Sequence, residues 1–198
     1  LENIVKLASN ENPIGMSPKA YDVISALADL NRYPDGNASA FKDKVASSFN
    51  VSPTMITVGN GSNDIIEFIA KCFLSTGDTA IYSKHGFAIY PLAIKASGAE
   101  AIKVEAKNWG HDLEAMADSI QENTKVIFIA SPNNPTGTVL SLRDIEKFLT
   151  KIPDNIIVLI DQAYFEYIEK EEFKIPFTLV EKFKNLIISR SFSKAHGL

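Results

Sequence analysis

The chain has 198 residues, of which 45% are hydrophobic, 22% charged and 10% aromatic, a composition typical of a globular protein of about one domain. The net charge of −4 comes from interspersed lysines and acids, so we expect neither a nucleic-acid surface nor a membrane-surface patch. No apolar run is long enough to span a bilayer, and the first residues lack a signal-peptide pattern. The single cysteine, Cys72, excludes an internal disulfide. We expect it in a helix core, and we expect the protein to be cytoplasmic.

Segments with helical and strand periodicity alternate along the chain. Pro18 suits the first turn of the first helix, and Ser141 with Asp144 has the spacing of a capping box at the start of a later one. In chain order, the pattern predicts a helix at 17–30, a helix at 38–49, a strand at 55–58, a helix at 63–74, a strand at 79–83, a helix at 87–97, a strand at 101–106, a helix at 112–120, a strand at 125–130, a helix at 141–150, and strands at 156–160 and 186–189.

This alternation predicts the fold class. The strand at 156–160 is apolar throughout, which is typical of a strand that helices cover on both faces. Alternating strands and helices then predict an α/β fold, a three-layer α/β/α arrangement around a mostly parallel sheet. The polar, turn-rich start of the chain distinguishes residues 1–35, an N-terminal arm with the first helix, from the main domain at 36–198.

Four polar segments each follow a predicted strand. They are GNGSND after 55–58, SPNNPTG after 125–130, DQAYFEY after 156–160 and RSFSKAHG after 186–189. In an open α/β sheet, ligands bind beyond the carboxyl ends of the strands. We therefore expect these four segments to meet at the mouth of one site.

The first two segments each leave two interpretations. Glycines between a strand and a helix let backbone N–H groups approach a phosphate, but such turns often need glycine without any ligand. A dinucleotide fingerprint is incomplete, because Asp64 stands where a third glycine is required. In SPNNPTG, Asn134 can present its amide to a ring oxygen or a carboxylate. A plain turn is the alternative.

The last two segments carry an acid and an amine. Asp161 ends an aliphatic strand, where a carboxylate needs a cationic or hydrogen-bonding partner; a helix N-cap is the alternative. Tyr164 points the same way if the following turn is helical. Lys194 at the mouth of the sheet can become a desolvated, nucleophilic amine, and a lone surface lysine is the alternative. Ser191 and Ser193 flank it with hydroxyls that suit a phosphate.

One cofactor matches all four segments. A phosphate suits the glycines and serines, a basic ring nitrogen suits Asp161, a ring hydroxyl suits Asn134 and Tyr164, and an aldehyde suits Lys194. These are the groups of pyridoxal phosphate. We expect no metal site, because the three histidines have no metal-ligand spacing, and we expect each of them at the surface or in a turn: His85, His111 and His196.

A set of motifs runs through essentially the whole chain in this order: NENP, YPDG, GNGSND, HGFAIYPLA, SPNNPTG, DQAYFEY and SRSFSKAHGL. Together they resemble the fold type I pyridoxal-phosphate aminotransferases. The resemblance implies that Lys194 forms the aldimine with the cofactor and shuttles the substrate proton. It implies that Asp161 pairs with the pyridine nitrogen, and that Tyr164 and Asn134 bind the ring hydroxyl.

The resemblance also assigns residues to the phosphate, the ring face and the substrate. Phe87 matches a ring-stacking aromatic, although a core position competes with that role. Tyr33 matches a tyrosine that reaches the cofactor of a partner subunit, which implies a homodimer. Asn12, with Asn134, faces the substrate. The phosphate is assigned to Ser62, Asn63, Ser191 and Ser193.

The implied activity is transfer of an amino group between histidinol phosphate and 2-oxoglutarate, in histidine biosynthesis. An aromatic aminotransferase, a threonine-phosphate decarboxylase, a non-catalytic nucleotide-binding module and a bare scaffold remain alternatives. The chain departs from the family in two ways. Gln162 stands where the family has a glutamate, and the family continues past SKAHGL into a small C-terminal domain. We therefore expect the 198 residues alone to be an inactive part of the large domain.

Overall fold

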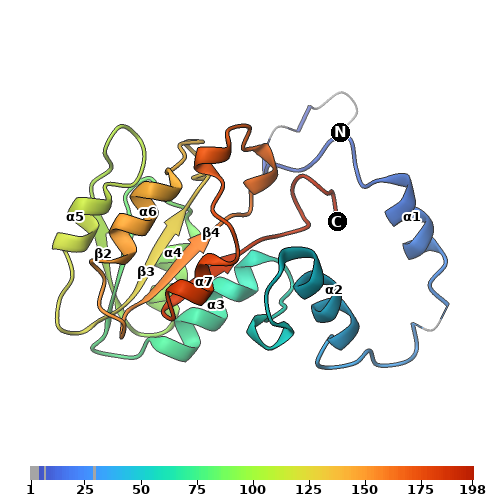
Figure 1. Cartoon of the computed structure of the whole chain (residues 1–198), viewed down its shortest axis with the longest axis horizontal. Helices are drawn as coiled ribbons and strands as arrows, with labels where there is room; N and C mark the ends of the chain where they lie inside the picture. Colours follow the sequence, from blue (N-terminus) through green and yellow to red (C-terminus); the bar gives the residue numbers. More distant parts are fainter. Residues whose placement is uncertain (1–4, 7, 29) are drawn as a thin grey trace.

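The structure is a computed structural model that describes residues 5–6, 8–28 and 30–198. Within these residues, five strands form one sheet in the order β2-β1-β3-β4-β5. Their bounds are β1 Thr79–Ser83, β2 Glu100–Val104, β3 Thr124–Ala130, β4 Ile157–Asp161 and β5 Leu186–Ser189. Every neighbouring pair is parallel, and helices pack around the sheet (Figure 1). The predicted α/β fold is confirmed.

The helices of the described part follow the predicted pattern closely. Their bounds are α1 Pro18–Ser25, α2 Ser39–Phe49, α3 Ser62–Phe73, α4 Ile89–Ala96, α5 Leu113–Asp118, α6 Leu142–Leu149 and α7 Leu179–Lys182. The predicted cap of α6 is present, because the Ser141 hydroxyl accepts the N–H of Asp144 at 3.1 Å. The sequence pattern did not predict α7 or the short 3-10 turns at Phe165–Tyr167 and Glu171–Phe173.

The sheet has a separate hydrophobic core on each face. Side chains of β3 alternate between the two cores, as the period of two of a strand requires: Ile127 and Ile129 join one core, and Val126 and Phe128 join the other. Helices α5, α6 and α7 cover the first core, and α3 and α4 cover the second. The three-layer arrangement is therefore built from both faces of one strongly apolar sheet.

Two expectations about local structure are wrong. Residues 55–58 form no strand: Pro53–Met55 is a 3-10 turn, and Ile56 after it is extended but pairs with no strand of the described chain. An extended apolar segment becomes a strand only when a neighbour pairs with its backbone. Cys72 is exposed because the buried stripe of α3 passes through Ile66, Ile69 and Ala70, and Cys72 lies beside that stripe.

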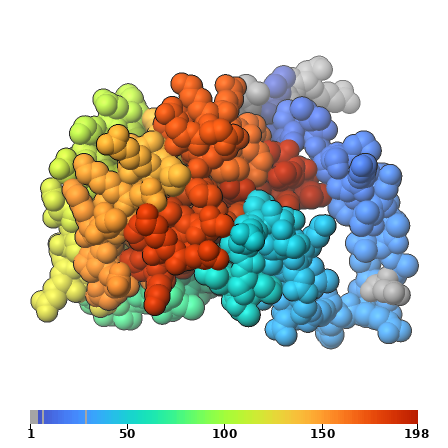
Figure 2. Space-filling model, in the orientation of Figure 1, coloured from blue at the N-terminus to red at the C-terminus, as the bar shows by residue number. Residues whose placement is uncertain are grey.

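The first helix lies away from both cores. Its N-cap is the Ser17 hydroxyl, which accepts the N–H of Ala20 at 3.2 Å, but α1 ends at Ser25 and buries none of its residues. Figure 1 shows it at one end of the molecule, and Figure 2 shows a hollow between this blue segment and the cyan α2 region. The large apolar side chains of this helix are consequently exposed, with Tyr21 at 62% and Val23 at 66%. Among the described residues, no helix combines the length and the apolar character of a membrane span.

Candidate active site

A cavity of about 960 Å³ lies beyond the carboxyl ends of β3, β4 and β5. All four of the polar segments singled out in the sequence line it. The segment after residue 58 contributes although no strand precedes it, since its glycines lead directly into α3. The predicted residues that line this cavity are Ser62, Asn63, Phe87, Asn134, Asp161, Tyr164, Ser191, Ser193 and Lys194.

Asp161 lies at the floor of the cavity as the last residue of β4, and it is 4% exposed. Its carboxylate accepts hydrogen bonds from the Ser189 hydroxyl at 3.1 Å, the Ala163 N–H at 3.1 Å and the Tyr90 hydroxyl at 3.2 Å. Burial raises the pKa of the Asp161 carboxyl, and these three hydrogen bonds act in the opposite direction. No ion pair in the described chain involves Asp161. The Asp161 carboxylate is therefore held by hydrogen-bond donors and has no cationic partner among the described residues.

Lys194 and Tyr164 lie close together at the same cavity. The Lys194 Nζ is 6.0 Å from the centre of the Tyr164 ring. The Tyr164 hydroxyl accepts hydrogen bonds from the Asn134 amide at 3.4 Å and from the Asn10 amide at 2.9 Å. Lys194 Nζ also donates to the Ser9 carbonyl at 3.1 Å. Residues 9 and 10, near the start of the chain, therefore contact both Lys194 and Tyr164.

The glycine segment forms a tight turn at the start of α3. The Asn60 N–H donates to the Asp64 carboxylate at 2.7 Å, and the Gly61 N–H donates to the Gly59 carbonyl at 2.9 Å. A Cβ on Gly59 would lie 2.8 Å from the Asp64 Cβ, so only glycine fits there. Asp64, which breaks the dinucleotide fingerprint, thus holds the turn. The segment presents the N-terminus of a twelve-residue helix to the cavity.

The two serines before the lysine form a compact turn of their own. The Ser191 and Ser193 hydroxyls are 2.6 Å apart, and the Ser193 N–H donates to the Ser191 Oγ at 3.1 Å. Both residues line the cavity together with the start of α3. The site therefore offers hydroxyl and backbone donors at one place, which suits an anionic group.

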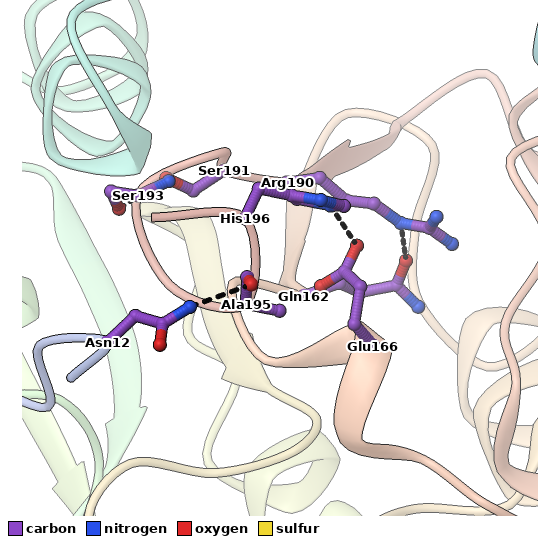
Figure 3. A network of polar contacts seen from close by, with 8 residues as sticks. All are labelled: Asn12, Gln162, Glu166, Arg190, Ser191, Ser193, Ala195 and His196. Atoms are coloured by element: carbon purple, nitrogen blue, oxygen red, sulfur yellow. Dashed lines mark hydrogen bonds and ion pairs between the residues drawn. The ribbon is translucent and has the colours of Figure 1, made fainter. Parts of the chain in front are cut away.

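Three predicted residues have less direct placements. Phe87 lines the cavity and also packs on the α3–α4 core, with its ring centre 5.9 Å from that of Tyr90. Asn12 lies outside the cavity lining; its amide donates to the Ala195 carbonyl at 3.0 Å and joins the arm to the lysine loop (Figure 3). Tyr33 is fully exposed and does not line the cavity.

Arg190 lines the cavity and is partly buried. Its Nε donates to the Gln162 Oε1 at 3.1 Å (Figure 3), and the Gln162 Nε2 donates to the Ile175 carbonyl at 3.1 Å. Burial lowers the pKa of Arg190 to about 10, against the opposing effect of the Glu166 charge. The neutral Gln162 therefore anchors the guanidinium by a hydrogen bond. Three phenyl rings lie within cation–π distance: Phe165 at 3.3 Å, Phe177 at 4.4 Å and Phe49 at 5.3 Å.

Sequence reasoning missed several residues that shape the site. Tyr90 and Ser189 bind the Asp161 carboxylate, yet both lie inside apolar runs, where nothing indicates a polar role. Ser9 and Asn10 lie in the cavity wall, and both adopt a positive φ that no motif predicted. Their common feature is a contact with a residue far away in the chain.

The described residues contain no group of three or more His, Cys, Asp or Glu side chains placed to hold a metal ion. His196 is exposed and lies 3.4 Å from Glu166 (Figure 3). The expectation that His111 lies at the surface or in a turn is wrong, because His111 is 7% exposed and packs against the end of β3.

Residues 2–198 match the family described as aminotransferase class I and II. The chain belongs to this family. It is 49% identical over 199 residues to histidinol-phosphate aminotransferase 2 of Hydrogenovibrio crunogenus, covering 100% of this chain and 53% of that protein. It is 51% identical to histidinol-phosphate aminotransferase 1 of Mannheimia succiniciproducens, covering 100% of this chain and 54% of the relative. The family predicted from the motifs is confirmed.

Solved structures show the same fold. The histidinol-phosphate aminotransferase of Sinorhizobium meliloti in complex with pyridoxal-5'-phosphate has a TM-score of 0.91 at 24% identity, covering 96% of this chain and 52% of that one. The L-threonine-O-3-phosphate decarboxylase of Porphyromonas gingivalis has a TM-score of 0.77 at 23% identity, covering 90% of this chain and 50% of that one. The chain spans about half the length of the curated relatives it matches.

Proposed function

We propose that this chain forms the cofactor-binding part of a pyridoxal-phosphate-dependent aminotransferase that acts on histidinol phosphate. One observation carries the proposal: the buried Asp161 carboxylate, which has no cationic partner among the described residues, shares a single cavity with the Lys194 amine and the Tyr164 hydroxyl. In this proposal residues 36–198 are the cofactor domain, residues 1–35 are an arm, and the protein is cytoplasmic.

The residues present fit pyridoxal phosphate. A protonated ring nitrogen is the cation that the Asp161 carboxylate lacks. The Asn134 amide and the Tyr164 hydroxyl, 3.4 Å apart, can both bind a ring oxygen. The α3 N-terminus and the serine turn supply donors for a phosphate. The Lys194 amine suits the aldehyde, and the cavity has room for the whole cofactor.

When bound, pyridoxal phosphate supplies a ring that stabilises negative charge at the substrate α-carbon. Asp161 holds the proton on the ring nitrogen, and its low-dielectric surroundings strengthen that interaction. Lys194 Nζ moves the substrate proton at the α-carbon. Tyr164 and Asn134 orient the ring, and Phe87 covers one side of the cavity. Ser62, Asn63, Ser191 and Ser193 bind the phosphate, and Asn12 holds the arm near the substrate side.

The choice of histidinol phosphate is supported by the names of the relatives at 49% and 51% identity. The amino acceptor in this proposal is 2-oxoglutarate. The structural likeness to a threonine-phosphate decarboxylase keeps threonine phosphate as the substrate to compare. Turnover of histidinol phosphate, phenylalanine and threonine phosphate by the protein that carries this chain tests the choice, and preference for either of the last two would overturn it.

The cofactor assignment is tested by the absorption spectrum of the purified protein with and without pyridoxal phosphate. We expect a yellow protein that loses its colour on borohydride reduction. Peptide mapping should then find the reduced cofactor attached covalently to Lys194. Lys194→Ala should abolish both this attachment and turnover. A colourless protein that ATP or NAD protects against unfolding would instead support a nucleotide-binding module.

The homodimer is part of the same proposal, with Tyr33 reaching the cofactor phosphate of the partner subunit. It is supported by the full exposure of Tyr33 outside its own cavity. Mixing a Tyr33→Ala protein with a Lys194→Ala protein tests it. In the mixed dimer, the subunit that keeps Lys194 receives an intact tyrosine from its neighbour. We expect activity to return on mixing, and its failure to return while mixed dimers form would contradict the shared site.

A further inference from the structure

His111 takes the position of a missing strand neighbour at the end of β3. The pairing of β1 with β3 ends at Tyr82 and Phe128, whereas β3 continues to Ala130. The His111 Nε2 lies 2.9 Å from the Ala130 carbonyl oxygen and 3.1 Å from the Ala130 nitrogen. The imidazole therefore partners the strand backbone beside the loop that carries Asn134.

Two buried side-chain atoms in the described chain have no hydrogen-bond partner, the His111 Nδ1 and the Asn133 Oδ1. Asn133 is 4% exposed, and its Nδ2 donates to the His85 carbonyl at 2.9 Å and to the Thr136 Oγ1 at 2.7 Å. A carbonyl only accepts, so the orientation of the amide is fixed and its Oδ1 must be an acceptor. The segment that carries His111 passes close to this amide. A Cβ on Gly110, the residue before His111, would lie 3.1 Å from the Thr138 Oγ1, and that oxygen is 3.2 Å from the Thr136 Oγ1 to which the Asn133 amide donates. The Asn133 side chain also acts to raise the pKa of His111, which agrees with this placement.

The two neutral tautomers of His111 satisfy different numbers of buried groups. With the proton on Nε2, the ring donates to the Ala130 carbonyl, and three groups stay unpaired: the Ala130 N–H, Nδ1 and the Asn133 Oδ1. With the proton on Nδ1, the ring accepts from the Ala130 N–H and can donate to Asn133 Oδ1. Only the Ala130 carbonyl oxygen then lacks a hydrogen bond from the ring, and an unpaired buried carbonyl is less costly than an unpaired buried N–H. The second tautomer is favoured.

We infer that the Nδ1–H of His111 donates to the Oδ1 of Asn133, and that this makes His111 a positioning residue for the cofactor ring. The inference rests on the proposed function. Asn133 precedes Asn134, whose amide donates to the Tyr164 hydroxyl. Asn133 also holds the His85 carbonyl, two residues before Phe87. Through the Asn133 amide, His111 therefore supports the loop that carries Asn134 and the loop that carries Phe87, and in the proposed function both face the bound ring.

The tautomer is tested by nitrogen NMR of the protein that carries this chain, labelled with ¹⁵N-histidine. His111→Gln identifies the His111 signals by their loss. We expect Nδ1 to carry the proton and Nε2 to have the shift of a bare nitrogen, with or without the cofactor. A proton on Nε2 would overturn the inference.

The positioning role is tested with two variants, each of which places an amide near the position of one of the two ring nitrogens. His111→Asn retains an amide donor near the position of Nδ1, and His111→Gln retains one near the position of Nε2. We expect His111→Gln to raise the Kd for pyridoxal phosphate about tenfold, and His111→Asn to stay within about threefold of the wild type. Thermal unfolding of the cofactor-free proteins shows how much stability each variant loses.

A double-mutant cycle separates positioning from plain packing. In an Asn133→Ala background, His111→Gln should no longer change the Kd, because its route to the ring is already removed. Equal and additive losses for both His111 variants would overturn the role. If the wild-type protein binds no pyridoxal phosphate, the proposed function fails, and the NMR result alone decides the His111–Asn133 bond.

Discussion

Replacing Asp161 by Asn should stabilise the cofactor-free protein and at the same time weaken its hold on the cofactor. The side chains have the same shape, so the Asn Oδ1 still accepts from Ala163 and Ser189. The new Nδ2 takes the place of the Asp161 oxygen that lies 3.2 Å from the Tyr90 hydroxyl in the wild type. A hydroxyl can accept as well as donate, so this hydrogen bond can be kept with its direction reversed. Only the buried negative charge is removed.

The direction of the change follows from the pKa of Asp161, which burial raises above the ordinary value of 3.8. A carboxyl with a higher pKa in the folded state binds its proton more tightly there, so stability is lost as pH rises from the unfolded pKa through the folded pKa. At pH 7.5 the folded protein therefore carries the cost of a buried charge without a cationic partner, and a neutral Asn of the same shape does not. Removing such a charge should raise the free energy of unfolding at pH 7.5 by roughly 1–3 kcal/mol.

Denaturant unfolding of the cofactor-free protein at pH 7.5 and at acidic pH measures the difference. The gap between Asp161→Asn and wild type should shrink in acid, where Asp161 is itself protonated. Asp43→Asn, at an exposed position of α2, controls for the change of net charge. Added pyridoxal phosphate should stabilise the wild type much more than Asp161→Asn. A variant no more stable than wild type at pH 7.5 would show that the buried charge is already compensated.

Three further predictions concern the arm, the buried histidine and the enclosed arginine. Gly197→Ala should speed proteolysis of the arm, since Gly197 has a φ of +65° and a Cβ there would lie 2.7 Å from the Gly15 carbonyl carbon; an unchanged cleavage rate would contradict this contact. Burial lowers the pKa of His111 from 6.5 to about 4, so the unfolded state is protonated at a higher pH than the folded state and stability falls as pH drops. Between pH 7.5 and 5, the free energy of unfolding of the wild type should fall by about 2 kcal/mol more than that of His111→Asn. The same pH dependence of unfolding in both proteins would refute this prediction. Arg190→Lys should cost about 1–2 kcal/mol in denaturant unfolding because a lysine cannot stack among the phenyl rings, whereas Arg143→Lys, exposed on α6, should change little.

The order of strands and helices is readable from local pattern because each element is set by its own residues. The apolar run that becomes β4 needs cover on both faces wherever it lies, and Ser141 caps α6 through atoms three residues apart. The grouping of the three site segments that follow β3, β4 and β5 has the same local origin, because parallel strands end at one edge. The lysine, the aspartate and the tyrosine around the cavity are therefore recognisable before any coordinates exist.

Other features depend on partners that are distant in the sequence. Residues 55–58 have the composition of a strand but lack a neighbouring strand to pair with. Tyr90 lies 71 positions from the carboxylate to which it donates, and His111 lies 19 positions from the backbone that it contacts. Local sequence determines which backbone conformations and which buried faces are favourable. Only the folded chain decides which buried polar group finds which partner, because the partners lie on different elements that are far apart in the sequence.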